Sequence, residues 1–520
     1  MKLDQTSGLV QERLFMLIKS LNKSEKRNVK LYLTRSYRKK DSNIYIKLFD
    51  VISQQRVYDE QQLHVHLNKS MSLNKRKLAN LKYVLYDLIL KSLRILYSDQ
   101  SIDFKIRVLL DEVEILYHKS LHIQSFKILK KVRKLALEHE RFTHIPEIIR
   151  WTRLVFTQVA DSFDSGKFAT LLEENTQVND YLKQEQELKE VLNQLTFLFR
   201  EKGKIQNEKD RIHLKVIMTN PILQIDRSQL PFSSKIILHE IYVVYHQLLQ
   251  DHYNAYLSYQ KLIKLWNTEP EKILNAKTHY MSSILNLSIT SIILQNNNNG
   301  IDSVSIIQQL PTKFTHESIQ REAYEKVITL LYQIFNEDSK QALNSTVKNL
   351  FNEYQSIMNS LDDFRVKYHI CIAYFLTDRP KEALYWGNLL LESRYQSISC
   401  YLQDFIRVLS LILHYEMGDL IYLDYLYRSV YRFLKKRPYS PQFELILIKL
   451  LKKAFQASSI ELPKKVFQDI EQLIIEYTDP IYAHSFEYRC LQAWAKSKLS
   501  KNSILHEYQQ LIKAKPLLVC

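Results

Sequence analysis

Glycine is scarce in this chain: 6 of the 520 residues are glycine, about a sixth of the roughly 7% usual in soluble proteins. Glycine supplies the positive φ angles of tight hairpins, bulges and phosphate-binding loops. Its scarcity argues against barrels, sandwiches, Rossmann turns and P-loops, and favours an all-α fold. The chain is also rich in Lys, Asn, Ile and Tyr, a bias typical of A+T-rich genomes, so its 33 tyrosines are not evidence for base stacking.

Long apolar runs and paired cysteines are also missing. No stretch reaches the roughly 18 apolar residues of a membrane-spanning helix, so we expect no membrane insertion. Asp4, Glu12 and Arg13 interrupt the first apolar positions, which argues against a signal peptide. The four cysteines form no CxxC pair, which predicts buried thiols in a reducing compartment and therefore a cytoplasmic protein; they are Cys371, Cys400, Cys490 and Cys520.

Motifs for catalysis and cofactor binding are absent as well. The chain contains no GxSxG, HExxH, Walker A or GxGxxG sequence. His118 and His122 are four residues apart, but no Cys or Asp nearby in the sequence completes a metal site. We therefore expect a protein that is not an enzyme, with no catalytic residues, metal, cofactor or small-molecule substrate. An active site assembled from distant residues is the alternative.

Apolar residues recur at helical spacing through most of the chain. One such stripe predicts a helix within 74–93; it consists of Leu78, Leu81, Leu85, Leu88 and Ile89. Asn22 and Glu25 have the spacing of a capping box, which predicts a helix that begins near Ser24. The segment QNNNNGIDS at 295–303 is poor in helix-forming residues and is predicted to be an exposed loop. We accordingly expect a basic helical domain at 1–100 and helical-repeat regions at 101–294 and 304–520.

Residues 363–395 resemble a tetratricopeptide repeat. Tyr374 follows the small Cys371 by three residues, Ala383 lies twelve after Cys371, and Leu390 lies seven after Ala383. The match departs at Cys371, where glycine is usual, and at Gly387, where an aromatic residue is usual. Weaker copies occur at 409–438, around Tyr245–Pro270 and at 117–138. The resemblance implies a right-handed solenoid of degenerate helical hairpins whose concave surface binds a peptide or helix of another protein.

The N-terminal stretch LIKSLNKSEKR at 17–27, with Leu48–Phe49 and 78–93 downstream, resembles the start of an uncharacterised family of helical-repeat proteins from Bacteroidota. This resemblance implies a bacterial, cytoplasmic protein and assigns no activity.

Positive charge is concentrated near the N-terminus. Residues 1–150 carry a net charge of +14, whereas the other 370 residues carry +3. Between residues 19 and 40, nine basic residues accompany a single acid, Glu25. Such a surface suits phosphates or an acidic protein. The candidate binding residues are Lys19, Lys23, Lys26, Arg27, Lys30, Arg35, Arg38, Lys39, Lys40, Lys75, Arg76, Lys77 and Lys82.

We therefore expect an adaptor or scaffold whose basic N-terminal third binds nucleic acid, a ribosome or an acidic protein, and whose repeats bind a protein partner. A solvent-exposed lysine face without a partner is the simpler interpretation, and a membrane-surface role is a third. A DNA-binding transcriptional regulator is the main functional alternative. In it, helices at 59–67 and 74–93 would form a helix-turn-helix with Lys75, Arg76 and Asn80 facing the groove.

Overall fold

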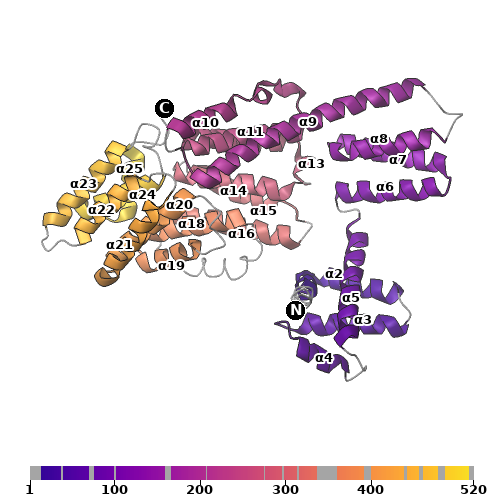
Figure 1. Cartoon of the computed structure of the whole chain (residues 1–520), viewed down its shortest axis with the longest axis horizontal. Helices are drawn as coiled ribbons and strands as arrows, with labels where there is room; N and C mark the ends of the chain where they lie inside the picture. Colours follow the sequence, from indigo (N-terminus) through magenta and orange to yellow (C-terminus); the bar gives the residue numbers. More distant parts are fainter. Residues whose placement is uncertain are drawn as a thin grey trace. The chain divides into compact units, whose positions relative to one another are not determined.

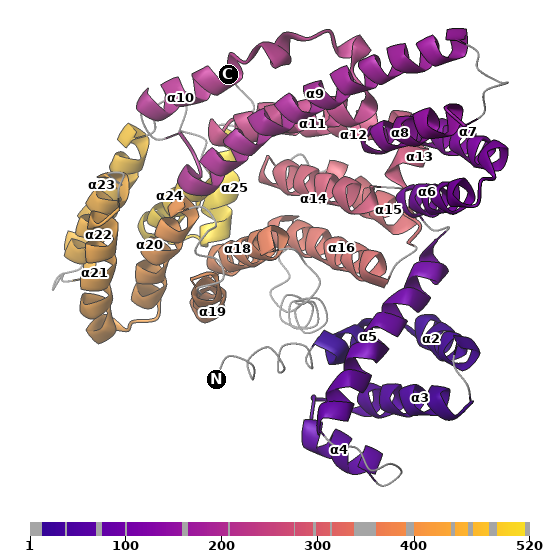
Figure 2. The ribbon, with the colours of Figure 1, turned by 45° about the vertical axis from the view of Figure 1, so that its right-hand side comes forward.

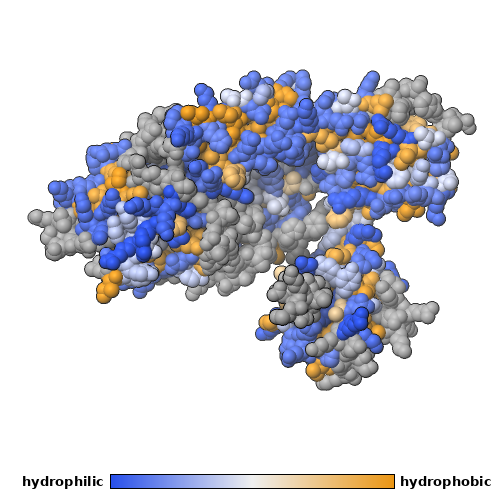
Figure 3. Space-filling model, in the orientation of Figure 1, coloured by the Kyte–Doolittle hydropathy of each residue, from blue (hydrophilic) through white to orange (hydrophobic). Residues whose placement is uncertain are grey.

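The protein is helical throughout the part described by the computed structural model. That part comprises residues 13–36, 39–68, 75–98, 101–158, 165–205, 208–274, 276–294, 298–312, 315–336, 360–391, 400–437, 442–455, 461–477 and 486–514. No strand occurs among these residues, which confirms the all-α prediction. Nor is any helix within them long and apolar enough to cross a bilayer. In the space-filling view, hydrophilic residues cover most of the visible surface and apolar residues are scattered between them (Figure 3).

The chain forms two compact units, Met1–Leu172 and Glu173–Cys520, here called unit 1 and unit 2. The division falls inside the 38-residue helix α9 (Ser165–Lys202). In unit 2, buried side chains on both sides of residue 300, such as Leu294 and Ile307, belong to one core. The domain boundaries expected near residues 100 and 294–304 remain predictions.

Unit 1 begins with a small helical cluster that has its own core. Its helices are α2 (Lys23–Ser36), α3 (Lys39–Gln54), α4 (Glu60–Asn68) and α5 (Lys75–Tyr97). Helix α2 packs on α3 and α5, and α3 packs on α4 and α5. The stripe predicted on α5 is the buried face: Leu78, Leu85, Leu88 and Ile89 lie in the core, and Leu81 packs against it.

The predicted capping box forms at the start of α2. The backbone N–H of Asn22 donates to Glu25 Oε2 over 2.6 Å, and the Glu25 N–H donates to Asn22 Oδ1 over 2.9 Å. These two bonds satisfy backbone donors that a helix N-terminus leaves without partners. Helix α2 accordingly begins at Lys23, next to the predicted Ser24.

The rest of unit 1 contains a helical hairpin and the helix after it. These elements are α6 (Ile102–His118), α7 (His122–Glu138), a 3₁₀ turn (Phe142–His144) and α8 (Ile145–Phe156). The Ser125 hydroxyl on α7 donates to the carbonyl of Val113 on α6 over 3.2 Å. A side chain as small as serine at this contact lets the two helices approach closely.

Unit 2 is a succession of helices, most of which pack on the next one along the chain (Figures 1 and 2). Helix α18 also contacts α24 and α25, so segments far apart in sequence meet. After α9 the helices are α10 (Glu208–Met218), α11 (Phe232–Leu248), α12 (His252–Thr268), α13 (Pro270–Ile273), α14 (Lys277–Ile293), α15 (Asn298–Gln309), α16 (Thr315–Asn336), α18 (Ser360–Leu376), α19 (Pro380–Leu390), α20 (Cys400–Glu416), α21 (Leu420–Lys435), α22 (Gln442–Phe455), α23 (Glu461–Tyr477), α24 (Phe486–Ser500) and α25 (Ile504–Ala514).

Tight turns with a left-handed residue close five helical hairpins. The residue has a φ of 56–73° in each turn. In four of them its successor donates a backbone hydrogen bond back to the preceding helix, as Arg379 does to Tyr374 O over 2.9 Å. This is the Schellman pattern, in which glycine is usual. Here it is mostly made without glycine, which is how a chain with so little glycine still folds into hairpins; the left-handed residues are Ser120, Gln250, Asp378, Gly418 and Lys501.

The hairpin α18–α19 has the close helix approach that its sequence predicts. Cys371 and Ala383 are fully buried, and the Cys371 thiol donates to the Ala383 carbonyl over 3.2 Å. A Cβ atom at Gly387 would meet Cys371 Sγ at 3.7 Å. Cys371 and Cys490 are buried free thiols, as predicted, and burial raises the pKa of Cys371 to about 12. The side chains of Cys400 and Cys520 lie outside the described residues.

The prediction of a loop at 295–303 is wrong from Asn298 onward, where the chain is helical. Helix α15 begins there and packs on α14 and α16. Ser303 and Ile307 are buried one turn apart on this helix. Burial of one face against two neighbouring helices stabilises the helix despite the poor helix propensity of its first residues. Residues 295–297 lie outside the described part.

Candidate functional site

Helix α2 carries five of the thirteen predicted basic residues. Val29 and Leu33 are fully buried, and Tyr32 packs against the same core. The opposite side therefore faces solvent, and the predicted amphipathic arrangement is confirmed. Exposed on it are Lys23, Arg27 and Arg35, with Lys26 and Lys30 half-buried beside them.

The one carboxylate of α2 is withdrawn from this surface. Glu25 is buried, where it accepts from the Asn22 N–H and from the Tyr97 hydroxyl of α5. Lys30 forms an ion pair with Asp50 of α3 at 2.6 Å. The other four cations, here called the α2 cations, lie within 4 Å of no carboxylate that the structure describes; they are Lys23, Lys26, Arg27 and Arg35.

Lys19 lies just before this helix and is exposed, but its ammonium group already has partners. It donates to the Ser53 carbonyl over 2.8 Å and lies 5.4 Å from the centre of the Phe15 ring. Its charge remains at the surface while the side chain is held in place.

The basic residues of α5 form a separate group. Arg76 and Lys77 are exposed in the first turn of α5. Helix α2 contacts α5 much further along, where the Asn28 amide donates to the Ser92 hydroxyl over 3.3 Å. Ser92 and Arg76 are separated by about 24 Å along α5, given a rise of 1.5 Å per residue. The part played by Arg76 and Lys77 in a binding surface with the α2 residues remains a prediction.

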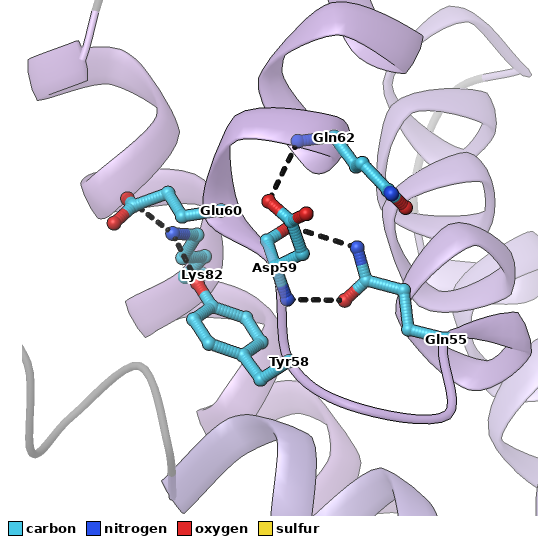
Figure 4. Close-up of polar contacts among 6 residues, drawn as sticks. All are labelled: Gln55, Tyr58, Asp59, Glu60, Gln62 and Lys82. Atoms are coloured by element: carbon cyan, nitrogen blue, oxygen red, sulfur yellow. Dashed lines mark hydrogen bonds and ion pairs between the residues drawn. The ribbon is translucent and has the colours of Figure 1, made fainter.

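Lys82 is not part of any binding surface, contrary to the prediction. Its side chain is 2% exposed, and its ammonium group donates to the Tyr58 hydroxyl and to Glu60 Oε1, both over 2.8 Å (Figure 4). Burial lowers the pKa of Lys82, while Glu60 opposes that shift. Burial near two carboxylates raises the pKa of Tyr58 in turn. The Lys82 contacts instead connect α5 to the α3–α4 turn.

The same turn is held by a second set of bonds around Asp59. The Gln55 amide donates to the Asp59 carbonyl over 2.8 Å, and Asp59 Oδ1 caps α4 by accepting from the Gln62 N–H over 3.0 Å (Figure 4). These contacts fix α4 relative to α3. They show a rigid structural turn rather than a reactive site.

Four predicted residues cannot be placed as side chains. Arg38 lies outside the described residues. Lys39, Lys40 and Lys75 are the first residues of α3 and α5, and their side chains are not described. Their part in a binding surface remains a prediction.

A basic face on α7 was missed by the sequence reasoning. Its lysines are exposed while Leu129 and Val132 between them are buried. Lys134 pairs with Glu138 at 3.6 Å, and Lys130 lies 4.6 Å from the Phe126 ring centre. The spacing KxxKKxxK is itself the helical signal that could have identified this face; its members are Lys127, Lys130, Lys131 and Lys134.

Comparison with protein families, curated proteins and solved structures finds no match to this chain. The resemblances to tetratricopeptide repeats and to the Bacteroidota family therefore remain predictions.

Proposed function

We propose that this protein is a non-enzymatic adaptor, in which unit 1 binds an acidic partner and the helical hairpins of unit 2 bind a second protein. In this proposal unit 2 is a degenerate tetratricopeptide-like solenoid, and the protein acts in the bacterial cytoplasm. The hairpins with their recurring left-handed turns support the solenoid.

The observation that carries the proposal is the charge of the α2 face. Five cations lie on that side of the helix, and the helix's one carboxylate is buried. Only Lys30 is paired with a carboxylate among the described residues. An array of cations on a helix that is already folded loses little conformational entropy on binding. It attracts phosphates or acidic side chains, and each neutralised phosphate releases counterions.

A DNA-binding regulator is the second candidate. Helices α4 and α5 match the predicted pair to within a few residues, and the connecting residues 69–74 lie outside the described part. Arg76, Asn80 and Tyr83 are exposed on successive turns of α5, where the recognition helix of a helix-turn-helix contacts bases. Tyr83 beside them is 67% exposed.

The test is a titration of fluorescently labelled RNA and duplex DNA at several salt concentrations. If the protein is an adaptor, its affinity for nucleic acid should fall steeply with salt concentration and should be the same for all sequences. Each lost phosphate contact should reduce the slope of the logarithm of the binding constant against the logarithm of the salt concentration by about 0.7–0.9. The test variant reverses the α2 cations to Glu. The matched control reverses Lys209, Lys215, Lys464 and Lys465 to Glu, exposed residues of unit 2 that give the same net charge.

The two variants separate the outcomes. A loss of binding confined to the α2 variant supports the α2 face, whereas equal losses in both variants attribute binding to net charge alone. Preference for one duplex by several kcal/mol that depends on Arg76 and Asn80 favours the regulator. Absence of binding at low salt excludes nucleic acid and leaves an acidic protein as the partner.

A further inference from the structure

A groove in unit 2 lies on helix α20, between α19 and α21. Helices α19 and α21 each pack on α20, so α20 is its floor and the other two are its walls. The groove has a volume of about 430 Å³, within the range of sites that hold small ligands or peptide side chains. The floor residues Arg407, Ser410 and His414 repeat at helical spacing on one face of α20.

Polar groups on this floor have unused hydrogen-bonding capacity. Arg407 Nε and His414 Nδ1 are buried and have no hydrogen-bond partner. Buried polar atoms in folded proteins are nearly always paired, so two unpaired atoms on the residues that line one groove are exceptional. His414 Nδ1 lies 3.4 Å from Asp419 Oδ2 at one end of the groove, too poorly aligned to form that bond.

Arg407 supplies positive charge at the other end. Its guanidinium group lies 4.0 Å from the centre of the Phe433 ring, and no carboxylate in the described part of the chain lies within 4 Å of it. Arg437 lies over the same ring at 4.5 Å, but it is neutralised by the buried carboxylate of Asp404. Burial lowers the pKa of Arg407, and Arg437 adds to that shift while Asp404 opposes it. An added anion would therefore be stabilised at Arg407.

The walls of the groove carry exposed apolar side chains. Tyr422 and Leu426 line the α21 wall, and Tyr422 packs on His414 with ring centres 4.7 Å apart. Tyr425 is 65% exposed, and its ring centre lies 6.0 Å from that of Tyr422. Single exposed apolar residues are ordinary, but two neighbouring exposed tyrosines at the edge of a groove favour an interaction site. Tyrosine and arginine are the residue types enriched among energetically dominant interface contacts.

We propose that this groove docks a short segment of a partner protein that carries one Asp or Glu carboxylate and, about two helical turns away, an aromatic or aliphatic side chain. The carboxylate pairs with Arg407, and the apolar side chain packs on Tyr422 and Leu426. This proposal rests on the adaptor function and specifies the partner of unit 2. It also places that partner in a groove between α19 and α21, whereas the tetratricopeptide resemblance implied the concave surface.

The apolar walls favour a peptide carboxylate over a free phosphate. Arg407 and His414 are seven residues apart, or about 10 Å along α20, so an anion of either kind at Arg407 avoids Asp419 at the opposite end of the groove. Tyr422 and Leu426 in the wall can pack against a peptide side chain but contribute nothing to the binding of an inorganic ion.

The experiment pans a phage-displayed library of random twelve-residue peptides against the full-length protein and measures the selected peptides by fluorescence anisotropy. We expect enrichment of Asp or Glu spaced from an aromatic or aliphatic residue. Replacing that acidic residue by its amide in the peptide should weaken binding about tenfold or more, the loss expected when one partner of a charged interfacial pair is removed. This comparison leaves the protein unaltered and so does not depend on the folding of a variant.

Two protein variants and one control locate the site. Arg407→Met should weaken binding to the same extent as the amide peptide and should no longer distinguish the acid from the amide. Tyr425→Ala, at a largely exposed position, should weaken binding about three- to tenfold. Lys435→Met is the control, because Lys435 is exposed on α21 about half a turn from the groove-lining face.

Other outcomes overturn the proposal. The proposal is wrong if the selected peptides are not enriched in Asp or Glu, or if Arg407→Met selects the same acidic peptides as the native protein. Either result shows that the groove does not recognise a carboxylate. Displacement of the peptide by about 1 mM inorganic phosphate, with no effect of Tyr425→Ala, assigns a free-anion site instead. Nucleic-acid binding by the α2 face, measured on the same variants, should be unchanged, so failure of the groove is distinguishable from failure of the adaptor function.

Discussion

Lysine is used differently on the α2 face of unit 1 and in the core of unit 2. Residues 1–172 carry a net charge of +14 and residues 173–520 carry +3. In unit 1, Lys23 and Lys26 of α2 lie near no described carboxylate. In unit 2, Lys277 is 1% exposed and pairs with Glu317 at 3.0 Å. Each unit also contains the other kind, since Lys82 of unit 1 is buried and Lys209 of unit 2 is exposed. Burial therefore decides whether a lysine is available for a partner.

Lys204 is the extreme case in unit 2. It is buried after α9, with its ammonium group 4.1 Å from the Tyr401 ring centre and donating to the Tyr488 hydroxyl over 2.7 Å. The Tyr368 hydroxyl donates to nearby Glu487 over 2.7 Å. These contacts join segments almost 300 residues apart, and they make Lys204 part of the packing between the early and late helices of unit 2.

The largest effect should come from breaking the buried pair. Lys277→Met leaves the Glu317 carboxylate buried without its partner, which should reduce the free energy of unfolding by about 3–5 kcal/mol. Lys23→Met, the matched change on the exposed face of α2, should change it by less than about 0.5 kcal/mol. Urea denaturation followed by tryptophan fluorescence reports on both units, because Trp151 lies in unit 1 and Trp266, Trp386 and Trp494 lie in unit 2. Similar losses in both variants would remove the distinction between buried and exposed lysines.

A smaller effect should appear in the pH dependence of unit 2. Burial lowers the pKa of Lys204 from 10.5 to about 8, partly opposed by Glu444 and Glu487. Between about pH 8 and 10.5 the unfolded chain therefore binds more protons at this residue than the folded chain does, and stability rises with pH. The gain approaches about 3 kcal/mol, at 1.36 kcal/mol per pKa unit.

The comparison to make is the slope of stability between pH 8 and 9.5 in the native protein and in Lys204→Met. This window ends below the ordinary tyrosine pKa of about 10. The native slope should exceed the variant slope. Equal slopes would show that Lys204 titrates as an ordinary exposed lysine and contradict its placement in the core.

The smallest effect on stability should come from glycine substitutions in the hairpin turns, and it should be the same in both units. Ser120 in unit 1 and Lys501 in unit 2 are exposed residues with φ near 60° in hairpin turns. Ser120→Gly and Lys501→Gly should each stabilise the protein by about 0.5–1 kcal/mol, because glycine adopts this φ without steric cost. Gly418→Ala should destabilise by about 1 kcal/mol through the backbone alone, since its Cβ would meet nothing within 4 Å. Thermal unfolding measures all three, and a stabilising Gly418→Ala would contradict the argument.

Local signals in the sequence predicted much of the first cluster of unit 1. The capping box of Asn22 and Glu25, the amphipathic α2 and the apolar face of α5 all form as their spacing indicates. The close contact of Cys371 with Ala383 was predicted in the same way. Each of these features depends on residues within one or two neighbouring helices, where periodicity and capping chemistry are decisive.

The prediction was wrong where a distant contact decided the outcome. Lys82 lies in a basic stretch of sequence, yet Tyr58 and Glu60 bury it. The end of the asparagine-rich segment is part of α15 because α14 and α16 pack against that helix and stabilise it. No sequence pattern around these residues specifies the partner that controls them.

By itself the sequence determined that the chain is helical, that a helix begins just after Asn22, and that positive charge concentrates in the first third of the chain, because these properties depend on composition and on spacing within one helix. The tertiary structure alone decided which charges remain available. The tertiary structure buries Glu25 on the inner side of α2 and pairs Lys277 with Glu317. It leaves the Nε atom of Arg407, a residue that lines the groove, without a hydrogen-bond partner. Desolvation and pairing depend on which segments meet, and segments that meet here are separated by as many as 284 residues.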